Sequence, residues 1–239
     1  MAIRNPSWSR DELIVTLEFY LRHKSTIPNK QSPEITELSD FLNRLQSKLG
    51  GDASDTFRNV NGVYMKLMNF RRFDPAYTGK GLERGNKDEE VVWNLFKERP
   101  NELRKVSESI RSLVQSEEPL PSKEMISDDE EEGAEGQVLT RTHRYRERNT
   151  KLVKKKKEKV LEEEGNLTCE VCGFNFVVKY GERGDGFIEC HHTKPVSDLK
   201  AGEKTRVADL SLLCSNCHRM IHRRRPWISI DELKQLLSH

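Results

Sequence analysis

Four of the five cysteines fall into two C-x-x-C pairs, Cys169 with Cys172 and Cys214 with Cys217. Paired thiolates at this spacing suit a tetrahedral zinc ion, and closed sites of this kind are structural. A domain this small, with few large apolar residues, would be marginal without the metal, so we predict a structural zinc site. The alternative, a redox dithiol, would need a single C-x-x-C beside a βαβ pattern. The remaining Cys190 is expected to be an ordinary buried thiol.

A second group of side chains that can bind a metal or move a proton lies between and after these pairs. His218 and His222 are four residues apart, so on a helix they share one face at metal-ligand spacing. Because four thiolates already fill a tetrahedral ion, the histidines predict a second metal site with open positions. In the alternative interpretation they only complete the fold. The members of the group are Glu189, Cys190, His191, His192, Asp209, His218 and His222.

A run of arginines follows these histidines, on or just after the same predicted helix. Such cations could bind phosphates beside a reacting bond. The alternative is a basic, solvated helix end that the helix dipole favours. The residues are Arg219, Arg223, Arg224 and Arg225.

The charge distribution along the 239 residues indicates where the chain divides. Lys+Arg 41 and Asp+Glu 39 give a net charge of only +2, which hides two opposite segments. Residues 117–136 hold one basic and nine acidic residues, with too little apolar surface to fold, and we expect a linker there. Residues 137–159 hold ten basic and two acidic residues. This basic segment, with Lys154, Lys155, Lys156 and Lys157, is expected to track a DNA backbone, although a nuclear-import signal would look similar.

The first domain, residues 1–116, is predicted to be helical throughout. Ser9 and Glu12 form a capping box, Ser32 before Pro33 opens a second helix, and a third is expected from about Asp55. Two more helices are expected around residues 91–96 and 103–114. Lys66, Arg71 and Arg72 lie among aromatic residues, as on nucleic-acid surfaces, but a core with a solvated cationic face explains them equally well. Trp8, Tyr64 and Trp93 could line a pocket for a flipped base, although such rings are more often core.

Two further features bear on where the chain acts. No apolar run approaches the roughly 18 residues that a membrane span needs, and the N-terminus lacks the apolar stretch of a signal peptide. These features predict a cytoplasmic protein without a membrane partner.

The C-terminal motifs together resemble a known family. The C-x-x-C of Cys169 and Cys172, the run GFIECHHTKPVSDL and the run ADLSLLCSNCHRMIH resemble the HNH (ββα-metal) endonucleases over about residues 165–227. The longer form ADLSLLCSNCHRMIHRRRPW is similar to bacterial HNH nucleases grouped as McrA-like predicted restriction endonucleases. The N-terminal runs WSRDELI and NGVYMKLMNFRRFDP are similar, more weakly, to the domain that accompanies such modules.

The resemblance implies a role for each site residue. His191 and His218 would bind a catalytic divalent metal such as Mg²⁺ or Mn²⁺, and His222 matches a further ligand. His192 would be the general base, a task that suits a group with a pKa of about 6.5. Asp209 stands where the family usually has Asn, and it can accept a hydrogen bond but not donate one.

The fold and function that follow are an expectation with open alternatives. We expect a multidomain α+β chain: a helical DNA-recognition domain at 1–116, an acidic linker and basic segment at 117–159, and a zinc-stapled HNH domain at 160–239. It would cut double-stranded DNA as a bacterial restriction enzyme, with 5-methylcytosine or 5-hydroxymethylcytosine the leading target. Which modification is recognised, or whether one is required, stays open, as does a homodimer, standing or formed on DNA. The alternative is a zinc-stabilised DNA-binding protein that does not cleave.

Overall fold

The chain divides into two compact units, Met1–Thr142 and His143–His239. The computed structural model describes residues 5–51, 56–79, 87–116, 120, 136–147, 150–194, 205–224 and 227–237. Most of the predicted acidic linker lies outside the described residues. The division falls within helix α6 (Gln137–Glu147), so the basic segment contributes to both units. No helix in the described part of the chain is long and apolar enough to cross a membrane.

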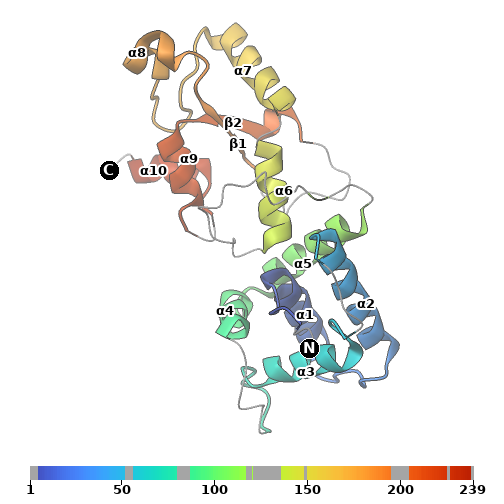
Figure 1. The fold of residues 1–239 in the computed structure, drawn as a ribbon. Coiled ribbons are helices and arrows are strands. Elements are labelled where there is room, and N and C mark those ends of the chain that lie inside the picture. Colours follow the sequence, from blue (N-terminus) through green and yellow to red (C-terminus); the bar gives the residue numbers. More distant parts are fainter. Residues whose placement is uncertain are drawn as a thin grey trace. The chain divides into compact units, whose positions relative to one another are not determined.

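The first unit is a helical bundle around its first helix (Figure 1). Helix α1 contacts each of the four helices that follow it. Its core-facing side chains include Leu13, Ile14 and Leu17, which are fully buried. The helical prediction for this region is therefore confirmed. The helices are α1 (Arg10–His23), α2 (Pro33–Lys48), α3 (Val60–Arg71), α4 (Lys87–Phe96) and α5 (Pro100–Gln115).

The first two helices begin at the capping residues that the sequence predicts. The Ser9 hydroxyl accepts from the Glu12 backbone N–H, and the Glu12 carboxylate accepts from the Ser9 N–H at 2.7 Å. The Ser32 hydroxyl caps α2 by accepting from the Ile35 N–H, and Pro33 occupies the first position of the helix. The third helix is expected from about Asp55, which lies outside the described residues, and α3 begins later, at Val60. Arg58 has a φ of 39°, a left-handed conformation through which a right-handed helix cannot continue.

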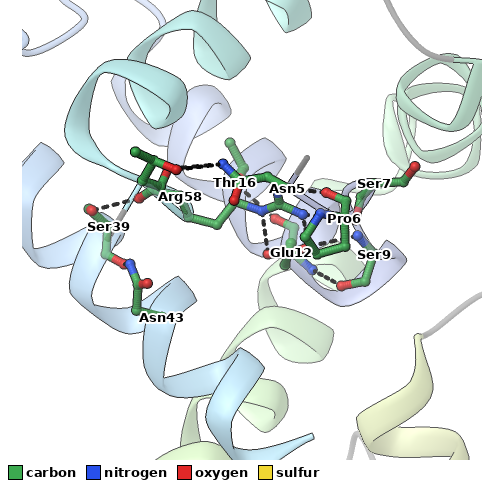
Figure 2. A network of polar contacts seen from close by, with 10 residues as sticks. Asn5, Pro6, Ser7, Ser9, Glu12, Thr16, Ser39, Asn43 and Arg58 are labelled. Carbon is green, nitrogen blue, oxygen red and sulfur yellow. Dashed lines mark hydrogen bonds and ion pairs between the residues drawn. The ribbon is translucent and has the colours of Figure 1, made fainter. Parts of the chain in front are cut away.

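A buried ion pair ties three segments of this unit together (Figure 2). Arg58 donates to both carboxylate oxygens of Glu12, at 2.6 and 2.9 Å. Its remaining N–H groups donate to the backbone carbonyls of Pro6 and Ser7, and its own carbonyl accepts from the Ser39 hydroxyl at 2.7 Å. Arg58 is 5% exposed and Glu12 is 2% exposed. The ion pair therefore links the N-terminal segment, α1 and α2, and both charged groups take part in hydrogen bonds.

Replacing Arg58 with Ala is expected to lower the free energy of unfolding by about 3–5 kcal/mol, because it leaves the Glu12 carboxylate buried without its cation. The matched control is Arg22→Ala, since Arg22 pairs with Glu18 at 3.5 Å and its side chain is 55% exposed. That change should cost less than about 1 kcal/mol. Urea denaturation followed by circular dichroism measures both, and equal effects would contradict the importance of the buried pair.

The second unit is built on a two-stranded antiparallel ribbon followed directly by a helix (Figure 1). Strand β1 (Glu189–His192) pairs with β2 (Leu210–Leu213), with His191 opposite Ser211 and His192 opposite Leu210. Helix α9 (Ser215–His222) begins two residues after β2 and contacts both strands. This is the predicted ββα arrangement. The other elements are α7 (Thr150–Glu164), α8 (Phe176–Tyr180), the 3-10 turns η2 (Gly181–Gly184) and η4 (Val207–Asp209), and α10 (Ile230–Leu237).

Two small apolar clusters hold these elements in place. One surrounds the cysteine pairs and contains Leu213, Ile221 of α9 and Leu233 of α10. The other joins Val160 of α7 to Leu212 and includes Cys190, which is 4% exposed. The prediction that Cys190 is buried is therefore confirmed. Helix α7, from the basic segment, is part of the support for the ribbon.

Candidate metal centre

The four paired cysteines converge at one point. Each offers a sulfur within 4.8 Å of the other three, and the Sγ atoms of Cys172 and Cys214 are 3.7 Å apart. The first pair sits in a tight turn in which the Gly173 N–H donates to the Cys169 carbonyl at 2.8 Å. Gly173 adopts a φ of 70°, which side chains disfavour. Four thiolates gathered in this way fit a tetrahedral zinc ion.

The second pair opens helix α9. Cys214 is the residue before the helix, and its Sγ accepts from the Cys217 N–H at 3.4 Å. Burial raises the pKa of Cys217 and of Cys172. For Cys169, burial also acts to raise the pKa, but hydrogen bonds with backbone groups outweigh it and lower the pKa. Since zinc needs thiolates, bound metal would offset the burial that opposes ionisation.

Three imidazoles form a second cluster beside the ribbon. His191 comes from β1, His222 from the last turn of α9 and His143 from α6. Their ring nitrogens lie within 4.8 Å of one another, and His222 Nε2 is 3.2 Å from His191 Nδ1. The sequence predicted His191 and His222, but not His143. A single histidine among the cations of the basic segment carries no spacing signal that could have identified it.

His218 lies next to this cluster and is held by a carboxylate. Its Nδ1 donates to Glu189 Oε2 at 2.7 Å, and its ring centroid is 5.2 Å from His191 and 4.9 Å from His222. The hydrogen bond from His218 is the main reason why the pKa of Glu189 lies below its ordinary value. A carboxylate on one nitrogen of a histidine is the usual support of a metal ligand, because it fixes the ring and its tautomer. His218 thus stays a predicted ligand through its other nitrogen.

His192 and Asp209 lie where the end of β1 contacts the turn η4. His192 ends β1, is 4% exposed and has its ring centroid 6.0 Å from that of His143. The next residue, Thr193, donates its N–H to the Asp209 carbonyl at 3.0 Å. The Asp209 carboxylate accepts from the Arg206 N–H at 2.7 Å. Both of these bonds use acceptor oxygens of Asp209.

The cations of the C-terminal unit differ in their accessibility. Arg219, Arg223 and Arg224 are exposed at the end of α9, whereas Arg225 lies outside the described residues. In α7, Lys154 and Lys155 are exposed. Two other lysines have structural contacts: Lys156 pairs with Glu170 at 3.5 Å, and Lys157 donates to the Gly186 carbonyl at 2.7 Å.

The predicted cations of the first unit are mostly engaged in its interior. Lys66 is 8% exposed, and its ammonium pairs with Glu89, which also lies 3.8 Å from Arg72. Arg71 stacks its guanidinium over the Tyr77 ring at 4.6 Å. A phosphate contact by Lys66 would therefore require a buried ion pair to break.

Two of the three rings suggested for a base pocket, Trp8 and Trp93, pack against other side chains of the first unit. Trp93 is 7% exposed and packs against Phe73 and Tyr20. Trp8 lies under the cations of Arg58 and Lys66. Trp93 thus belongs to the core, as the simpler interpretation expected.

Comparison with known proteins gives one match. Residues 169–224 match the family model described as HNH endonuclease. The matched range contains both cysteine pairs, the ribbon and α9, but not α6. Comparisons with curated proteins and with solved structures found no match.

Proposed function

We propose that this chain, which carries an HNH endonuclease domain at residues 169–224, is a metal-dependent endonuclease that hydrolyses phosphodiester bonds of double-stranded DNA. The observation that carries the proposal is the set of buried imidazoles beside a ββα element. Imidazole nitrogens gathered from separate elements are the donor set of a divalent metal. The predicted ligands His191, His218 and His222 all come from the matched range.

Each residue then has a defined task. A divalent ion held by these histidines would neutralise charge on the phosphate and on the leaving oxygen. His192 accepts a proton from the attacking water. Arg219, Arg223 and Arg224, exposed at the end of α9, bind the phosphates that flank the cut. The four-cysteine zinc site fixes the start of α9 and hence the position of His218 and His222.

The target is chosen by the helical first unit, and modified DNA is the leading candidate. The unit is compact in its own right, with a core separate from that of the HNH domain. Such an arrangement suits a restriction enzyme that recognises 5-methylcytosine or 5-hydroxymethylcytosine before cutting. Two copies acting on one duplex would account for a double-strand cut.

A panel of substrates tests this proposal. Unmodified, methylated and hydroxymethylated plasmids are incubated with the protein in Mg²⁺, Mn²⁺, Co²⁺ or Ni²⁺, and nicked and linear products are counted. We expect metal-dependent cleavage that is faster on a modified plasmid. Equal rates on all three would reject the modification requirement while retaining the nuclease. Binding without cleavage under every condition would favour a zinc-stabilised DNA-binding protein instead.

The two exposed lysines of α7 give a separate prediction about DNA affinity. Replacing Lys154 and Lys155 with Ala should reduce the slope of log affinity against log salt by about 0.9 for each phosphate that the variant no longer neutralises. Lys179 of α8 and Lys234 of α10, exposed in the second unit, provide the control pair, which should leave the slope unchanged. Fluorescence anisotropy with a short duplex at several salt concentrations measures both. An unchanged slope in the first pair would exclude these lysines from the interface.

A further inference from the structure

We propose that His143 of helix α6 is a ligand of the catalytic metal, supplied from outside the HNH match. The inference rests on the proposed function, since it concerns the same ion. His143, His191 and His222 are the three histidines whose ring nitrogens lie within 4.8 Å of one another. The matched family range begins at Cys169 and leaves helix α6 out. His143 therefore lies outside the part of the chain that the family model matches.

The spacing of the nitrogens fits a shared ion. Two nitrogens bound to one tetrahedral zinc at about 2.0–2.1 Å are separated by roughly 3.4 Å. His222 Nε2 and His191 Nδ1 are 3.2 Å apart, which is close to this value. The third nitrogen needs only a small side-chain movement to reach the same centre. With the predicted ligand His218, four protein nitrogens would bind the ion, and a six-coordinate ion would still have two positions open for water and a phosphate oxygen, as hydrolysis requires.

Packing holds the His143 ring in this place. His143 is 4% exposed, and its centroid lies 5.1 Å from that of His222 and 6.3 Å from that of His191. The Trp227 ring packs against His143 and His222, with its centroid 4.7 Å from that of His143 and 4.3 Å from that of His222. A ring that is buried and confined on one side by an indole loses little further freedom on binding a metal. The site is thus pre-organised for three imidazoles.

The donor set also predicts which metals bind best. Imidazole nitrogens prefer Zn²⁺, Ni²⁺ and Co²⁺, whereas Mg²⁺ prefers oxygen ligands. With His143 added to His191, His218 and His222, the ion would have four nitrogen donors and is expected to be a transition metal. The basic segment then has two roles: Lys154 and Lys155 face solvent for DNA, while His143 completes the metal site.

Metal binding by the full-length protein tests the inference without relying on cleavage. The zinc-loaded protein is titrated with Co²⁺ by calorimetry and visible absorption, with zinc content measured afterwards. His143→Phe keeps a ring against Trp227 but removes both nitrogens. His143→Asn, a second variant, replaces the ring with a smaller polar side chain. Removing an outer partner of a metal ligand typically costs about 10–100-fold in affinity, so removing a ligand should weaken Co²⁺ binding at least that much. Thr140→Ala, one turn earlier in α6, is the control and should bind as the wild type does.

The pattern across variants separates this inference from the proposed function. Weak Co²⁺ binding by His143→Phe and by His191→Ala, with zinc and helix content retained, is the expected result. If His191→Ala loses Co²⁺ while both His143 variants bind it normally, His143 only packs against its neighbours and the inference is overturned. If His191→Ala also binds Co²⁺ and cleaves normally, the histidine cluster is not the catalytic site, whereas a wild-type protein that binds Co²⁺ but cleaves no DNA would overturn the proposed function and leave the His143 result standing.

Discussion

Cleavage of plasmid DNA by His192→Ala is expected to be slower than by the wild type by about 10²–10⁴-fold, the usual contribution of a general base. His192 follows His191 at the end of β1, so a proton acceptor sits one residue from a predicted metal ligand. The contact between His191 Nδ1 and His222 Nε2, at 3.2 Å, does not involve the His192 ring. His192 can therefore be removed while His191 and His222 keep their contact. The measurement is the initial rate of nicking at saturating metal.

The controls for this variant are binding and metal content. His192→Ala should bind duplex DNA, Co²⁺ and zinc as the wild type does, because neither the cysteines nor the imidazole cluster is changed. His23→Ala alters a histidine of α1 in the first unit and should cleave at the wild-type rate. A His192→Ala protein that cleaves normally would remove His192 from the chemistry and leave the base unassigned.

The parts of the site that could be predicted from sequence are those whose residues are close in the chain. Cys214 and Cys217 lie on one turn, and His218 and His222 are one turn apart on the same helix, so their spacing alone predicts shared faces. The capping box of Ser9 and Glu12 is a local pattern of the same kind. In each case the geometry follows from helix periodicity.

The parts that could not be predicted depend on contacts between distant segments. His143 reaches His191 and His222 only after α6 has packed in the fold, and its neighbours in sequence are cations. Lys66 looks like a surface cation until Glu89, from another helix, buries it as an ion pair. The start of α3 is displaced because Arg58 takes a left-handed conformation while its side chain bonds Glu12 of α1. Local sequence patterns therefore fail to predict the features that depend on contacts between distant segments of the chain.

Removal of the four-cysteine metal is expected to unfold the second unit. Zinc bound by four thiolates contributes apparent folding free energies of about 10–16 kcal/mol in small domains at neutral pH, which matches or exceeds the net stability of an ordinary domain, about 5–15 kcal/mol. The apolar clusters around the cysteines are small, and the cysteines themselves form part of one of them. Cys217→Ser, or chelation of the wild type, should abolish zinc binding and the ordered signal of α9 in circular dichroism.

Cys190→Ala is the matched control, because Cys190 is equally buried but belongs to the other apolar cluster. It should keep one zinc per chain.

The histidine metal site depends on the zinc site, whereas the zinc site does not depend on the histidine site. Cys214 and Cys217 fix the first turn of α9, and His222 lies in its last turn, so removal of zinc should abolish Co²⁺ binding and cleavage together. His191→Ala should abolish Co²⁺ binding but leave zinc and the fold intact. A Cys217→Ser protein that stays folded and cleaves DNA without zinc would contradict this order, and would place the structural support of the histidines in α6 and the ribbon instead.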